Sequence, residues 1–285
     1  MDFSKVKLVV TDMDGTLLNS KSEVSNQFLG LYNKLKELKI KFIAASGRQY
    51  FSIVDRFDKS IRDEITIVAE NGAFVMHGDK ELFSSNLPSE YILKSIHILR
   101  ELKNVYIVLC GKKSAYIESK DEKFINMFKN YYSEYEIVND LTKVKNDTFF
   151  KIAAYNFECS ETNIYPAVKH FENKLQVIVS GKNWLDISHL NANKGYALTI
   201  IQKQLNISKA ETMVFGDYNN DLKMLELADF SYAMENAHPR VKEVANFKTK
   251  SNNNSGVEFI LKQLINSKKQ PVLLLLRRQK PIRCF

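Results

Sequence analysis

The sequence predicts an α/β fold in which a core with a parallel sheet is interrupted by an inserted α+β domain. Buried β-branched runs alternate with amphipathic stretches near both ends of the chain, a pattern typical of parallel sheets. Between about residues 84 and 188 the pattern changes to shorter strands and helices. Acidic clusters follow the predicted core strands, and sites in open α/β sheets form at the carboxyl ends of strands.

The core elements follow from the spacing of apolar residues. The run at residues 5–11 is apolar and β-branched, which predicts a central strand. Four apolar residues then recur at helical spacing, which indicates an amphipathic helix. The predicted order is a strand at 5–11, a helix at 24–39, a strand at 41–45, a helix at 49–58, a strand at 64–69 and, much later, a strand at 212–215 that leads into a helix.

The inserted domain mixes both kinds of element. Its predicted helices are at 88–102, 121–131 and 160–173, and its strands are at 105–109, 114–118, 149–154 and 175–179. The predicted domains are a core of residues 1–83 and 189–266, an insertion of residues 84–188, and a basic tail of residues 267–285.

Composition indicates a packed protein of the cytoplasm. Of 285 residues, 45% are apolar and 26% charged, and three cysteines without paired spacing suggest neither a disulfide framework nor a zinc site. Acids at Asp2, Asp12 and Asp14 argue against a secretory signal peptide. Apolar runs are too short for a membrane helix, so no membrane partner is expected.

The net charge of +8 comes mostly from the tail, where six Lys and Arg follow Asn266 without any acid. The remaining chain is nearly neutral, which argues against a nucleic-acid-binding body.

The pair Asp12 and Asp14 is the sharpest chemical signal. Two carboxylates two residues apart at a strand end point to the same side, and Gly15 frees the backbone to turn. One carboxylate can attack phosphorus while the other moves protons, and both are hard ligands for Mg²⁺. Solvated acids at a turn are the structural alternative.

Three further segments complete a phosphate-handling pattern. Asp217 and Asp221 follow the strand at 212–215 and can ligate Mg²⁺. Ser46 and Gly47 close the second strand with a hydroxyl and exposed amides, the components of an anion-binding turn. Lys194 begins a helix and can neutralise phosphoryl oxygens. Each element alone is more often structural, but the ordered set is hard to explain by chance.

These motifs resemble those of the haloacid dehalogenase superfamily of phosphatases, specifically its Cof-type branch. The match extends over about residues 5–265. The matching segments are Asp12-Met-Asp-Gly-Thr-Leu, Ser46-Gly-Arg, Glu70-Asn-Gly-Ala, Asn193-Lys-Gly, Gly216-Asp-Tyr-Asn-Asn-Asp, Met234-Glu-Asn-Ala and Asn254-Ser-Gly-Val. The resemblance implies a Rossmann-like core with an α/β cap inserted between the second and third motifs.

The resemblance also implies roles for individual residues. Asp12 would form a phosphoaspartate, and Asp14 would protonate the leaving alcohol and then activate water. Thr16, Ser46, Gly47, Lys194 and Asn220 would hold the phosphate, with Lys194 also assisting catalysis. Mg²⁺ would be bound by the side chains of Asp12 and Asp217 and the backbone carbonyl of Asp14, with Asp221 in support.

The leading hypothesis is therefore a Mg²⁺-dependent phosphatase that hydrolyses small phosphorylated metabolites, with sugar phosphates foremost. A phosphomutase of the same fold is one alternative, and a non-catalytic phosphate sensor or nucleic-acid-binding protein that uses the basic tail is another. Free phosphate or an isomer as product separates the first two, and turnover of an aryl phosphate separates both from the third. Neither the physiological substrate nor the oligomeric state is predicted.

Overall fold

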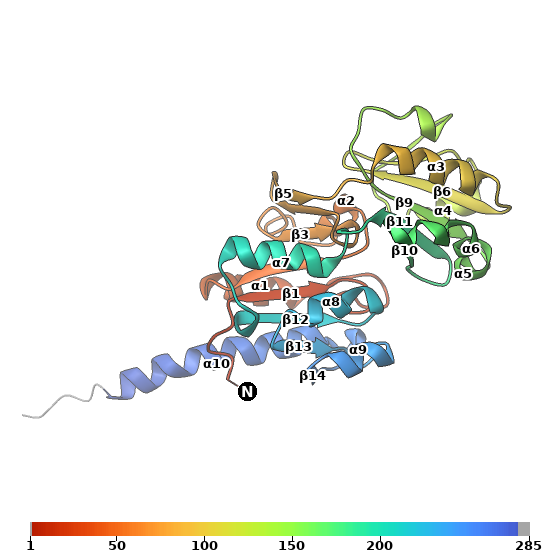
Figure 1. The fold of residues 1–285 in the computed structure, drawn as a ribbon. Helices are drawn as coiled ribbons and strands as arrows, with labels where there is room; N and C mark the ends of the chain where they lie inside the picture. Colours follow the sequence, from red (N-terminus) through yellow and green to blue (C-terminus); the bar gives the residue numbers. More distant parts are fainter. Residues whose placement is uncertain (1, 279–285) are drawn as a thin grey trace, which may run out of the picture. The chain divides into compact units, whose positions relative to one another are not determined.

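The computed structural model describes residues 2–278, with side chains described as far as residue 268. Two compact units make up this part of the chain. The first comprises residues up to Ile43 together with residues from Ile201 onward, and the second is Ala44–Ile200. Figure 1 shows the elements in chain order. Residues 279–285 of the predicted tail lie outside the described residues.

The first unit is built on a parallel sheet. Strand β1 (Leu8–Asp12) pairs with β12 (Thr212–Gly216), β12 pairs with β13 (Phe230–Ala233), and β13 pairs with β14 (Phe247–Lys248), all in parallel. Strand β2 (Lys41–Ala45) begins in this unit and lies on the other side of β1. Every residue of β1 and β12 is buried, as expected for central strands of a parallel sheet.

Helices complete the first unit. They are α1 (Phe28–Glu37), α8 (Leu222–Leu225), α9 (Pro239–Val244) and α10 (Gly256–Arg278), with 3₁₀ turns at Lys209–Glu211, Asn219–Asp221 and Asn252–Asn254. Helix α7 (Lys194–Leu205) passes from the second unit into the first. The apolar face of α1 is buried, and α1 contacts α10. Among the described helices, none combines the length and apolarity needed to cross a membrane.

The second unit contains two antiparallel arrangements. After α2 (Tyr50–Val54), strands β3 (Thr66–Ala69), β4 (Phe74–His77) and β5 (Lys80–Ser84) pair in succession. A short 3₁₀ turn at Glu70–Gly72 joins β3 to β4.

A six-stranded sheet forms the rest of the second unit, in the order β10-β11-β9-β6-β7-β8. All neighbouring strands are antiparallel except β7 and β8. The strands are β6 (Val105–Gly111), β7 (Ala115–Ile117), β8 (Tyr135–Ile137), β9 (Phe149–Asn156), β10 (Leu175–Val179) and β11 (Trp184–His189). Its helices include α3 (Ser89–Arg100), α4 (Glu122–Phe128), α5 (Ser160–Asn163) and α6 (Tyr165–Val168), with 3₁₀ turns at Leu141–Lys143 and Lys169–Asn173.

The two faces of this sheet carry separate apolar cores. Ile152 and Ala154 of β9 pack with residues of α3 and α6, whereas Ala153 and Tyr155 pack with Phe124 of α4. This alternation is the two-residue period of a strand.

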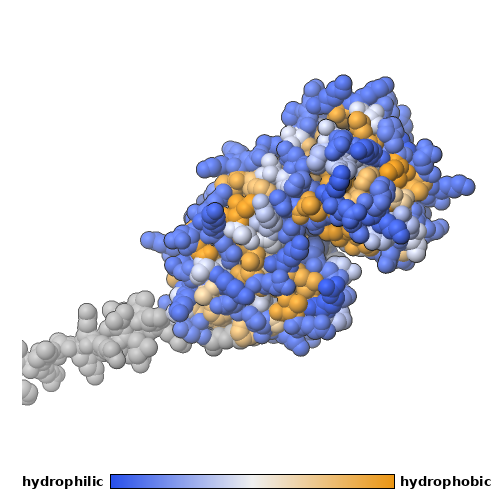
Figure 2. All heavy atoms as spheres, in the orientation of Figure 1, coloured by the Kyte–Doolittle hydropathy of each residue, from blue (hydrophilic) through white to orange (hydrophobic). Residues whose placement is uncertain are grey.

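The molecular surface in the view of Figure 2 is mostly hydrophilic, with smaller apolar patches between the hydrophilic side chains.

The α/β fold with a parallel-sheet core is confirmed, but two predicted helices are wrong in detail. The helix predicted at 49–58 is α2, which spans only Tyr50–Val54. Residues 160–173 form α5, α6 and a 3₁₀ turn rather than one helix. Pro166 stands in the first turn of α6, where its missing N–H costs nothing, and it could not continue a helix from α5. The strands that were not predicted are β4, β5, β8, β11, β13 and β14.

Candidate active site

Asp12 ends strand β1, and the chain then turns in a tight loop. The amide of Leu17 donates a hydrogen bond of 3.2 Å to the carbonyl of Asp12. Gly15 has φ +76°, a left-handed conformation that glycine adopts without steric cost. Asp12 is buried and Asp14 is exposed, so the two predicted carboxylates have different surroundings.

The second acidic segment follows β12, the neighbour of β1. Because Thr11 pairs with Phe215 in parallel register, Asp12 and Asp217 leave adjacent strands at the same edge of the sheet. Asp221 is fully buried, and its Oδ2 accepts hydrogen bonds from the amide of Asp217 at 2.9 Å and from the next amide at 3.2 Å. Asp221 therefore holds the turn that presents Asp217.

Three carboxylates gather at this edge of the sheet. Asp12, Asp217 and Asp221 each offer an oxygen atom, and these atoms lie within 4.8 Å of one another. Like charges at such distances repel, and a divalent cation among them removes the repulsion. The oxygen donors fit Mg²⁺, which prefers hard ligands and few carboxylates. The side chain of Asp14 is not part of this group.

The predicted phosphate contacts of the first unit lie beside these carboxylates. The hydroxyl of Thr16 donates a hydrogen bond of 3.0 Å to Oδ1 of Asp217. A Cβ on Gly15 would lie 2.3 Å from Oδ2 of Asp217, so any larger residue would displace that carboxylate. Asn220 is half-buried in the 3₁₀ turn after β12. Asn236 donates a hydrogen bond of 2.8 Å to the carbonyl of Gly15 and so holds the turn from outside.

The remaining predicted phosphate contacts lie in the second unit. Ser46 follows β2, and its amide donates to the carbonyl of Val68 at 2.8 Å. Its Oγ accepts a hydrogen bond of 3.1 Å from the amide of Arg48, which leaves the hydroxyl hydrogen for another acceptor. A Cβ on Gly47 would lie 2.8 Å from Oδ1 of Asn71, so the loop and Asn71 approach closely.

Lys194 is buried at the first position of α7. The helix start is fixed by Asn193, whose Oδ1 accepts a hydrogen bond of 2.8 Å from the amide of Tyr196. A Cβ on Gly72 would lie 2.4 Å from the carbonyl oxygen of Asn193, so the turn after β3 packs against this helix start.

Each unit thus gathers one set of predicted residues. Asp12, Asp14, Thr16, Asp217, Asn220 and Asp221 belong to the first unit, and Ser46, Gly47 and Lys194 belong to the second. Sequence reasoning gave no role to Asn236, although Met234-Glu-Asn-Ala was among the matching segments.

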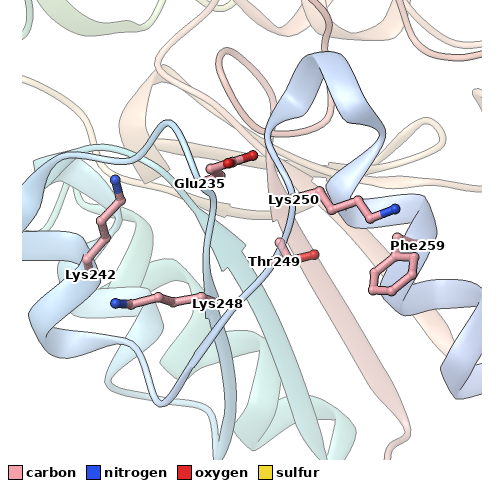
Figure 3. A pocket seen from close by; sticks show the side chains of 6 residues that line it. All are labelled: Glu235, Lys242, Lys248, Thr249, Lys250 and Phe259. Atoms are coloured by element: carbon pink, nitrogen blue, oxygen red, sulfur yellow. The ribbon is translucent and has the colours of Figure 1, made fainter.

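A separate hollow lies elsewhere in the first unit (Figure 3). Its lining comes from α9, β14 and α10 and the segments beside them, and comprises Glu235, Lys242, Lys248, Thr249, Lys250 and Phe259. The ammonium of Lys250 lies 4.3 Å from the ring centroid of Phe259. None of the predicted site residues lines this hollow, so the carboxylate edge is the better candidate.

Residues 9–261 match the family of haloacid dehalogenase-like hydrolases. The chain belongs to this family. Since that match covers most of the sequence, the predicted resemblance is confirmed.

Among related haloacid dehalogenase-like hydrolases, the 5-amino-6-(5-phospho-D-ribitylamino)uracil phosphatase YbjI of Escherichia coli is 32% identical, over 91% of this chain and 96% of that protein. The putative phosphatase YxeH of Bacillus subtilis is 28% identical, over 92% of this chain and 99% of that protein. The crystal structure of SMU.1108c from Streptococcus mutans superposes with a TM-score of 0.84 at 32% identity, over 92% of this chain and 99% of that one. The predicted enzyme class, a phosphoric monoester hydrolase, is confirmed.

Proposed function

We propose that this hydrolase removes phosphate from small phosphorylated metabolites through a phosphoaspartate on Asp12. The observation that carries the proposal is the gathering of Asp12, Asp217 and Asp221 at one sheet edge, within 4.8 Å of one another. A buried carboxylate at a strand end is held in place by the sheet, which suits a nucleophile.

The proposed reaction has two steps. A carboxylate oxygen of Asp12 attacks phosphorus, the bond from phosphorus to the ester oxygen breaks, and the leaving oxygen takes a proton from the carboxylic acid of Asp14. Water then attacks the phosphorus of the phosphoaspartate and gives its proton to Asp14, which releases phosphate and restores Asp12. The exposed position of Asp14 suits a group that must reach both an alcohol and water.

Mg²⁺ is the proposed cofactor, held by the side chains of Asp12 and Asp217 and the backbone carbonyl of Asp14, with Asp221 supporting. When bound, it neutralises charge between the attacking carboxylate and the phosphate. Thr16, Ser46, the Gly47 backbone, Lys194 and Asn220 are the proposed phosphate contacts. Electrostatic stabilisation of this kind supplies most of the catalysis in phosphoryl transfer.

Phosphorylated sugars and sugar alcohols are the proposed substrates. The name of the E. coli relative describes a phosphate on a ribityl chain, which is a primary phosphate on a polyol. Residues 84–188 are proposed to act as a cap that selects the leaving alcohol, because the groups that handle the phosphoryl unit are common to every monoester.

The test is a panel of phosphorylated metabolites, with added Mg²⁺ and phosphate release as the readout. Phosphorylated sugars and sugar alcohols should rank first by kcat/KM, and Asp12→Asn should be inactive on all of them. Conversion to a phosphate isomer without phosphate release would identify a mutase instead. Equal activity of parent and Asp12→Asn would overturn the mechanism.

A further inference from the structure

The turn between β3 and β4 has an unusual backbone. Glu70, Asn71 and Gly72 have φ values of +52°, +55° and +98°. Side-chain-bearing residues rarely adopt left-handed φ, and consecutive ones persist only where the surrounding structure imposes them. The turn is also buried. Its surroundings therefore indicate what it is held against.

Two of the proposed phosphate contacts flank this turn. The amide of Asn71 donates a hydrogen bond of 3.0 Å to the carbonyl of Ser46. On the other side, a Cβ on Gly72 would lie 2.8 Å from the backbone nitrogen of Lys194, which leaves room only for glycine. The turn therefore sets the spacing between the Ser46 loop and the start of α7.

A buried charged cluster holds the side chains of the turn. Lys151 of β9, Glu70 and Asp186 of β11 are 3%, 2% and 6% exposed. The Nζ of Lys151 lies 3.0 Å from Oε2 of Glu70 and 3.6 Å from Oδ1 of Asp186. Asn71 donates a hydrogen bond of 3.2 Å to Oδ2 of Asp186. Strands β9 and β11 of the six-stranded sheet thus hold the turn through the side chains of Glu70 and Asn71.

The same ammonium also reaches the Ser46 loop. Lys151 Nζ donates a hydrogen bond of 2.9 Å to the carbonyl of Gly47. The N–H of that same peptide group belongs to Arg48 and donates to Oγ of Ser46 at 3.1 Å. Fixing the carbonyl therefore fixes the N–H that orients the Ser46 hydroxyl.

This cluster is a costly way to fill a core. Taking charges from water is expensive, and apolar residues of similar volume often stabilise a fold more. Burial raises the pKa of Glu70. Burial would lower the pKa of Lys151, but the carboxylates of Asp186 and Glu70 more than offset this and raise it, so the ammonium stays charged. A charged lysine at this position is therefore better explained by a role in orienting polar groups than by a role in filling the core.

We propose that Lys151 is a positioning residue for phosphoryl transfer, which holds the Gly47 carbonyl and the Glu70 turn so that Ser46 and Lys194 meet the phosphate in fixed geometry. The proposal rests on the proposed phosphatase function. Strand β9 lies in the segment proposed to select the leaving alcohol. Through Lys151, the same strand would also position the groups that bind the phosphate.

The test measures competitive inhibition by inorganic phosphate, together with kcat and KM for an aryl phosphate. Lys151→Met should raise the Ki for phosphate at least about tenfold, because small misplacements of binding groups are costly. Lys151→Met with Asp186→Asn removes the excess buried negative charge and keeps the test valid if the single variant fails to fold. The control is Lys112→Met in the same unit, which removes the ion pair between Lys112 Nζ and Oε2 of Glu81, 2.5 Å apart. This variant should leave the Ki for phosphate unchanged.

A double-mutant cycle with Ser46→Ala separates positioning from general destabilisation. If Lys151 acts through Ser46, the two substitutions together should raise Ki by much less than the product of their single effects. A folded Lys151 variant with the parental Ki, or with fully multiplicative effects, overturns the proposal. If Ser46→Ala itself leaves the Ki unchanged, the result contradicts the proposed role of Ser46 as a phosphate contact. This outcome is distinct from one that contradicts the positioning role of Lys151.

Discussion

The hydroxyl of Thr16 donates a hydrogen bond of 3.0 Å to Oδ1 of Asp217, although 201 positions separate the two residues in the chain. The bond joins the turn after β1, which carries Asp14, to the turn after β12, which carries the proposed metal ligands Asp217 and Asp221. Parallel pairing of the two strands makes the contact possible, because it brings their carboxyl ends to one edge.

Replacing the proposed nucleophile should separate chemistry from folding. Asp12→Asn is nearly isosteric, but an amide does not attack phosphorus readily, so turnover should fall at least about thousandfold. Phosphate release measures turnover, and a thermal melt close to the parent shows that the fold is retained. A folded, uncontaminated variant with substantial turnover would contradict the phosphoaspartate mechanism.

Removal of the metal should stop the reaction. EDTA is expected to abolish turnover, and added Mg²⁺ to restore it, because two anions must otherwise approach without a counter-charge. Asp217→Ala should raise the Mg²⁺ concentration for half-maximal activity at least about tenfold or eliminate turnover. Asp229→Ala, which changes an exposed acid of the same unit, is the matched control. Full activity in metal-free buffer would falsify this prediction.

A pair of glycine substitutions tests the close approach of Gly15 to Asp217, a proposed Mg²⁺ ligand. Gly15→Ala would place a Cβ 2.3 Å from Oδ2 of Asp217, so the carboxylate must move and the Mg²⁺ requirement should rise. Gly30→Ala in α1 meets no atom within 4 Å and should stabilise the protein by about 0.5–1 kcal/mol. Titration of activity with Mg²⁺ and denaturant unfolding measure the two effects. Equal Mg²⁺ titrations for both variants would show that Asp217 tolerates the displacement.

Protonation of Glu211 should contribute to the loss of folding stability at low pH. Hydrogen bonds from Lys7 and from the backbone and hydroxyl of Ser208 lower its pKa from 4.5 to about 2 in the folded state. A lowered pKa means that the contribution is fully present above about pH 4.5 and is lost as the pH falls toward 2. Glu211→Gln should therefore reduce the loss of Tm between pH 5 and 3 relative to the exposed-site control Glu226→Gln. Identical profiles of Tm against pH for the two variants would show that Glu211 does not contribute to the acid sensitivity.

Local patterns predicted much of the core in advance. The burial of β1 and the amphipathic face of α1 follow from residue spacing, because strand and helix periods differ. The break at Pro166 was missed, because residues 160–173 were predicted as one helix although proline cannot lie inside a continuous helix. The short strand β8 gave no such signal, because three residues cannot display a period.

The sequence by itself determined which chemistry was available: paired aspartates at a strand end, a hydroxyl turn and a lysine at a helix start, each a local arrangement with a local physical cause. Only the tertiary structure decided that Asp12, Asp217 and Asp221 share one edge and that Lys151 grips the Gly47 carbonyl. A lysine in an apolar strand has no sequence signal for its partner. Its role depends on the register of β9 and β11 and on the chain that packs against that face, which local spacing does not encode.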